Sequence, residues 1–197
     1  MPKLFGLLVC LFVVPEIPEE PHILFRDIEF VGTEDFLSGP QVGSKIPGPF
    51  EPILMNGPNA GDAVCLYCQL GNAPTVMIFA PKPTDRLASL IRQLDKILAD
   101  AAKEVDVGAC LVVMDTSQAT QKALKHWVDQ HDLRYLSLGI INSGQLKIYL
   151  LTSETAVTII LYSNRLFGRI VPLKPVELTE GELQKLVGEV QAFLAIK

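Results

Sequence analysis

The sequence Cys65-Leu66-Tyr67-Cys68 carries the residues best suited to chemistry. Two thiols at Cys-x-x-Cys spacing favour disulfide formation and thiol–disulfide exchange. A structural disulfide, a redox-active dithiol, half of a metal site and two free structural thiols all fit this spacing. Two thiolates alone do not complete a tetrahedral zinc site, and no second Cys-x-x-Cys or close histidine pair supplies the missing ligands. We therefore expect a disulfide at this pair, and neither a metal nor a cofactor.

The other cysteines and the histidines add little chemistry. Cys10 lies in an apolar N-terminal run, and Cys110 lies inside an apolar strand pattern, where a thiol behaves as a small hydrophobe. We interpret His22, His126 and His131 as solvated or helix-capping residues. His126 and His131 are five residues apart, so they do not share a helix face.

Composition limits the class of protein. The chain has 197 residues, of which 49% are hydrophobic, and its net charge is −5. That apolar fraction excludes a disordered chain and indicates one folded domain. With 17 Lys and Arg residues and a net negative charge, the chain is not expected to bind nucleic acid.

The N-terminal third divides into two segments. Residues 1–14 place Lys3 before an apolar run, which resembles a secretory signal and is too short to span a bilayer. Residues 15–62 are rich in Pro and Gly and predict an extended arm, with an edge strand over 23–31. We expect an exported protein with one folded domain over 63–197 and no transmembrane span.

The remaining elements follow from hydrophobic periodicity. A buried strand is predicted over 76–80, and Thr84 then suits the N-cap of an amphipathic helix. A second buried strand over 110–114 precedes a second helix, which makes a parallel crossover unit. A hairpin over 157–171 and a final helix after Thr179 complete the chain.

The order strand–helix–strand–helix–hairpin–helix resembles the thioredoxin core. Residues 157–164 resemble that family's Pro-Thr-hydrophobic strand and its Ser-Asn turn, and 42–50 resemble the lead-in of peroxiredoxin-type proteins. Residues 65–74 resemble those of exported bacterial thioredoxin-like domains of unassigned function. The resemblance implies a thioredoxin-like α/β three-layer sandwich with an N-terminal extended arm, and it covers about residues 41–196.

The sequence departs from that family at its customary active site. There the Cys-x-x-Cys motif follows the first core strand, at a helix N-terminus that favours the thiolate. Residues 80–85 contain no cysteine here, and the peroxiredoxin cysteine is also missing. The family's cis-proline is replaced by Val157, which should follow a trans peptide bond. The Cys65/Cys68 pair precedes the strand, so we expect it near the opposite strand end and without the helix terminus that activates its thioredoxin counterpart.

Two functions follow from these patterns. The first is an exported binding or structural module with a Cys65–Cys68 disulfide and an empty customary site. The alternative is a thiol–disulfide oxidoreductase in which Cys65 is the nucleophile and Cys68 the resolving thiol. A protein or thiol partner is implied in either case, and the sequence does not identify it.

Overall fold

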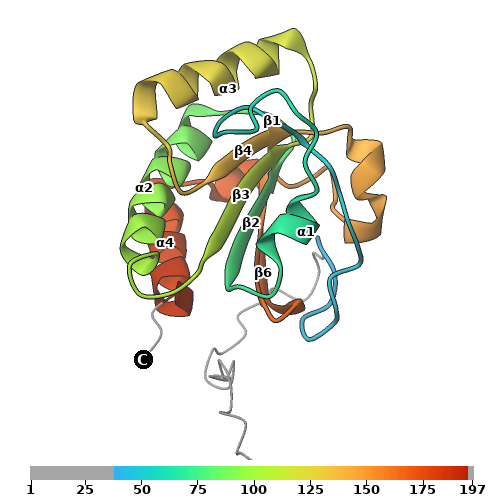
Figure 1. The fold of residues 1–197 in the computed structure, drawn as a ribbon, viewed down its shortest axis with the longest axis vertical. Helices are drawn as coiled ribbons and strands as arrows, with labels where there is room; N and C mark the ends of the chain where they lie inside the picture. The colour runs from blue at the N-terminus through green and yellow to red at the C-terminus, as the bar shows by residue number, and fades with distance from the viewer. Residues whose placement is uncertain (1–37, 195–197) are drawn as a thin grey trace, which may run out of the picture.

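A computed structural model describes residues 38–194 as one mixed sheet with helices on its faces (Figure 1). Residues 1–14, the edge strand predicted over 23–31 and Cys10 lie outside the described residues. The strands are β1 (Ile53–Leu54), β2 (Thr75–Ala80), β3 (Gly108–Val113), β4 (Ser137–Ile140), β5 (Val157–Ser163) and β6 (Leu166–Leu173). The helices are α1 (Leu66–Leu70), α2 (Asp85–Ala101), α3 (Gln118–His131) and α4 (Glu180–Leu194), with 3₁₀ helices η2 (Ser143–Tyr149) and η3 (Pro175–Glu177).

The six strands have the order β1-β4-β3-β2-β5-β6. β2, β3 and β4 are parallel, which requires the crossover helices α2 and α3. β5 runs antiparallel to β2 and forms the predicted hairpin with β6. β1 pairs antiparallel with β4 at the other edge of the sheet. The central strands β2, β3 and β5 are buried on both faces, which accounts for their nearly continuous apolar sequences.

Alternating side chains of the sheet divide the core into two clusters. Val76 and Ile78 of β2 face the first cluster, which includes the apolar faces of α2, α3 and α4. Met77 and Phe79 face the second cluster, which includes residues of the arm, α1 and η2. The sheet is therefore the middle layer of a three-layer sandwich, and α1 lies on the face opposite α2 and α4 (Figure 1).

Aromatic packing holds the described part of the arm on the second face. Phe50 lies 5.3 Å from Tyr149 and 5.8 Å from Phe79, measured between ring centroids. The Tyr149 hydroxyl donates a hydrogen bond of 2.8 Å to the carbonyl of Gly48. The arm thus contributes its own side chains to the core and covers the sheet next to α1.

The elements predicted from strong periodicity are present, and five shorter ones were not foreseen. The N-cap of α2 is Thr84, whose hydroxyl accepts from the amide of Leu87, as predicted. The elements that no pattern predicted are β1, α1, β4, η2 and η3. All of them are short, so their packing rather than their periodicity determines their structure.

Candidate functional site

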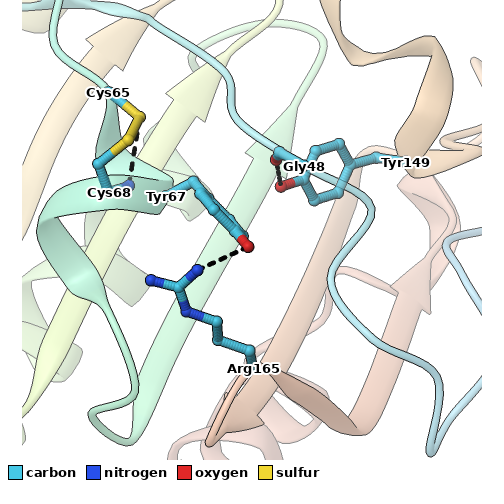
Figure 2. Close-up of a disulfide and its surroundings, with 6 residues drawn as sticks. All are labelled: Gly48, Cys65, Tyr67, Cys68, Tyr149 and Arg165. Atoms are coloured by element: carbon cyan, nitrogen blue, oxygen red, sulfur yellow. Dashed lines mark hydrogen bonds between the residues drawn. A yellow bond between two sulfur atoms is a disulfide. The ribbon is translucent and has the colours of Figure 1, made fainter.

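Cys65 and Cys68 form a disulfide at the start of α1 (Figure 2). Their Cα atoms are 5.3 Å apart, a usual separation for a disulfide. Cys65 is half-buried and Cys68 is exposed to solvent. The backbone amide of Cys68 donates a hydrogen bond of 3.2 Å to Cys65 Sγ. The expected disulfide is therefore present, and it lies at the surface.

The short helix α1 is fixed at both ends. Before it, the amide of Val64 donates to the carbonyl of Pro52, and inside it Leu66 is fully buried in the second cluster. After it, Gly71 has a φ of +58°, a conformation that favours glycine and ends the helix. The amide of Asn164 in the β5–β6 turn then donates to the carbonyl of Asn72. These contacts hold the disulfide in a defined place on the sheet.

The pair lies before the amino end of β2 and not at the N-terminus of α2, as expected, but a short helix at the pair was missed. Cys65 is the N-cap of α1. Five residues are too few to show helical periodicity, so α1 was not predicted. α1 precedes the amino end of β2, whereas α2 follows its carboxyl end. The pair therefore has a helix N-terminus of its own, distinct from the customary one.

Tyr67, between the two cysteines, is covered by a cation. The Arg165 guanidinium carbon lies 4.5 Å from the centre of the Tyr67 ring. Its Nη1 also donates a hydrogen bond of 2.7 Å to the Tyr67 hydroxyl (Figure 2). Arg165 belongs to the β5–β6 turn, so this contact links the hairpin directly to the disulfide helix. Sequence patterns give no signal for a pair separated by 98 residues.

The customary active-site position of this fold holds no thiol. β2 ends at Ala80, Pro81 and Pro83 follow, and Thr84 caps α2. The segment 80–85, which contains no cysteine, therefore lies between the first core strand and the next helix, as the sequence predicted.

Asp115, which follows β3, accepts hydrogen bonds from the hydroxyls of Thr120 and Ser117, and these bonds lower the pKa of its carboxyl. This carboxylate braces the start of α3.

The loop before β5 also differs from the customary arrangement. No cis peptide bond occurs within residues 38–194, so the bond before Val157 is trans, as predicted. In place of a proline contact, buried hydroxyls connect this loop to the arm. Ser38 Oγ lies 3.0 Å from Thr158 Oγ1, and the Thr158 hydroxyl donates 3.3 Å to that of Thr155. The described part of the arm therefore begins in contact with β5 and the loop before it.

The third cysteine within residues 38–194 is unreactive because it is buried. Cys110 is a free thiol, fully buried in β3, and this burial raises its pKa to about 12. It packs in the second cluster as the small hydrophobe that the sequence predicted. No group of three or more His, Cys, Asp or Glu side chains within residues 38–194 is arranged to hold a metal ion.

Solved structures with the same fold include several redox proteins. A candidate protein disulfide isomerase from Bacteroides thetaiotaomicron has a TM-score of 0.59 and 16% identity, over 82% of this chain and 96% of that one. A secreted disulfide oxidoreductase from Mycobacterium tuberculosis, homologous to E. coli DsbE, has a TM-score of 0.54 and 14% identity, over 73% and 95%. The reduced 2-Cys peroxiredoxin of Plasmodium vivax has a TM-score of 0.55 and 20% identity, over 77% and 82%.

These similarities define the fold. The chain has a thioredoxin-like fold and carries a Cys-x-x-Cys disulfide, as the sequence resemblance implied. At such low identities the similarity concerns architecture alone, since this fold supports many activities. No protein-family model matches the sequence, and no curated protein matches it. Among residues 38–194, none of the helices has the length and apolar character needed to cross a membrane.

Proposed function

We propose that this protein is a thiol–disulfide oxidoreductase that works through the Cys65–Cys68 disulfide on α1. The observation that carries the proposal is the position of this bond. Cys68 is exposed and Cys65 is half-buried, so a thiol from solvent can reach the bond. Exposed disulfides are the exchangeable ones, whereas disulfides that only brace a fold resist reduction.

The reaction transfers two electrons. A substrate dithiol, in its thiolate form, attacks one sulfur of the protein disulfide and gives a mixed disulfide, while the other protein sulfur leaves as a thiolate. The second substrate thiol then attacks the mixed disulfide. The substrate becomes a disulfide, Cys65 and Cys68 become thiols, and the two substrate protons reach them through water. The reverse sequence reduces a substrate disulfide.

The reduction potential tests this proposal. Equilibration in glutathione buffers should give a midpoint between about −120 and −270 mV, the range of working oxidoreductases. The protein should also catalyse reduction of insulin by dithiothreitol, and a Cys65→Ser/Cys68→Ser variant should not. A potential below about −300 mV together with no catalysis would show that the bond is a brace.

A second function is favoured by the empty customary site. Pro81 and Pro83 occupy the segment where working thioredoxins have cysteines, and a trans peptide precedes Val157. A binding module with a structural disulfide would carry such replacements at the customary site, and its Cys65–Cys68 bond would serve only to hold α1. In that case the double serine variant loses stability, and binding of a protein partner depends on the fold but not on the redox state.

We further propose that the protein works outside the cytoplasm. The apolar run over 4–14 resembles an export signal, and disulfides persist in oxidising compartments. The mass of the protein recovered from a bacterial host, measured with and without reduction, tests both points. A mass lowered by the signal segment and raised by two hydrogens on reduction supports export. Full-length, reduced protein confined to the cytoplasmic fraction contradicts it.

A further inference from the structure

The two sulfurs of the disulfide differ in their surroundings. Cys65 is half-buried at the junction between the arm and α1, where the preceding Val64 packs against the second cluster. Cys68 lies on the exposed side of α1, next to exposed Gln69. Leu66 points into the core and Tyr67 lies under Arg165. α1 thus turns its covered side chains toward the sheet and presents Cys68 to solvent.

We propose that Cys68 is the sulfur that exchanges with the substrate and that Cys65 is the leaving and resolving sulfur. This inference rests on the proposed oxidoreductase function and reverses the roles that the sequence suggested. Access decides which sulfur of a disulfide is attacked, and Cys68 is the more exposed residue of the two.

The hydrogen bond within the motif acts in the same direction. The amide of Cys68 donates to Cys65 Sγ at 3.2 Å, so a thiolate formed at Cys65 keeps a donor already in place. Hydrogen bonding to a charged form stabilises that form, and a stabilised thiolate is the better leaving group. No corresponding donor to Cys68 Sγ is found among the hydrogen bonds of residues 38–194.

The step balances as follows. A thiolate of a protein or low-molecular-weight thiol attacks Cys68 Sγ and forms a substrate–Cys68 disulfide. The Cys65–Cys68 bond breaks, and its electron pair leaves on Cys65 Sγ, which takes a proton from water. In the reverse reaction the Cys68 thiolate attacks one sulfur of a substrate disulfide, and the other substrate sulfur leaves as a thiolate. The Cys65 thiolate then attacks Cys68 Sγ and releases the first substrate sulfur as a second thiolate.

The position of the mixed disulfide tests this order. Oxidised full-length protein is mixed with excess glutathione, quenched in acid after short times, alkylated, and digested with chymotrypsin, which separates the cysteines by cleaving after Leu66 or Tyr67. Mass spectrometry should find glutathione on Cys68 and the alkyl group on Cys65, in a ratio of about ten to one, which corresponds to about 1.4 kcal/mol between the two attacks. The same protein unfolded in guanidinium chloride should show nearly equal labelling.

The other possible outcomes contradict either the assignment of roles to the two cysteines or the oxidoreductase function itself. Glutathione mainly on Cys65, or equally on both cysteines in the folded protein, overturns the assignment of roles and leaves the oxidoreductase function standing. The same bias in the unfolded protein shows that the fold does not direct the attack, and it also overturns the inference. An absence of adducts and of reduction, under conditions where unfolded protein reacts, overturns the proposed function itself.

Discussion

The guanidinium of Arg165 lies over the ring of Tyr67 and also donates a hydrogen bond to its hydroxyl, at 2.7 Å. Tyr67 stands between the two cysteines, and Arg165 stands in the turn between β5 and β6. Both Asn164 and Arg165 have positive φ angles, 51° and 59°. Two-residue hairpin turns of this kind prefer glycine at the second position, so the arginine costs backbone energy that its contact with Tyr67 offsets.

Replacing Arg165 with glycine should therefore loosen α1 without unfolding the protein. The variant loses the contact with Tyr67, worth about 1 kcal/mol, and gains a similar amount from relief of the turn. We expect a nearly unchanged free energy of unfolding, faster hydrogen exchange at the amides of α1, and reduction of the disulfide by glutathione that is several-fold faster. Asn164→Gly is the matched control, since it relaxes the turn and leaves Tyr67 covered. Equal exchange rates in α1 for both variants would show that Arg165 does not position the helix.

The disulfide itself should stabilise the fold only modestly. It closes a loop of four residues, for which loop-closure entropy gives about 2 kcal/mol. Urea denaturation of the Cys65→Ser/Cys68→Ser variant should show a loss of this size, and reduced wild-type protein should show a similar loss. A loss of about 4 kcal/mol or more in both would mean that α1 and its neighbours depend on the bond for packing, which favours the structural function.

Long periodic segments of this fold were predictable, and the site was predictable only in part. β2, α2 and the β5–β6 hairpin combine continuous or alternating apolar patterns with local caps and turns, so their residues specify them nearly alone. β1 has two residues and gains its place from pairing with β4. η2 depends on burial of Leu146 and Tyr149 against the arm. Such elements depend on distant partners, which a single sequence does not reveal.

The same reasoning explains the site. The Cys65–Cys68 bond and the lack of cysteine over 80–85 are local facts of the sequence, and both were foreseen. The Arg165 contact with Tyr67 and the hydroxyl link between Ser38 and Thr158 join segments 98 and 120 residues apart, and no periodicity encodes them. The helix that Cys65 caps is too short to show helical periodicity. The difference in exposure between the two cysteines was missed because it arises from this helix.

A partly buried carboxylate that joins α2 to the α3–β4 loop should be worth more than an exposed ion pair. Asp95 accepts backbone hydrogen bonds from Tyr135 at 2.8 Å and from Leu136 at 2.9 Å. Asp95→Ala leaves these amides without their acceptor and should cost about 2 kcal/mol in urea denaturation. Asp100→Ala, on the same helix, removes an exposed ion pair with Lys103 and should cost less than about 0.5 kcal/mol. Equal costs would refute the bracing role of Asp95.

The buried thiol of Cys110 should make the protein less stable in alkali. Burial raises the pKa of this thiol from 9.0 to about 12, so the folded state keeps it neutral while the unfolded state ionises it. The contribution to stability is complete below pH 9 and is lost as the pH rises from about 9 to about 12. Burial also raises the pKa of Tyr149 and of Tyr162, but the stability that these two tyrosines contribute begins to fall only near pH 10.

Comparison of wild-type protein with Cys110→Ala from pH 8 to pH 10 isolates the cysteine, because both proteins keep Tyr149 and Tyr162. Wild-type protein should lose about 1 kcal/mol of unfolding free energy over this range because of Cys110. Cys110→Ala should be less stable at pH 8, since it leaves a small cavity, but its stability should fall less steeply toward pH 10. Urea denaturation of both proteins at pH 8, 9 and 10 measures the difference in slope. Parallel curves would mean that the thiol ionises in the folded state as readily as in the unfolded chain, and that the core around β3 admits water.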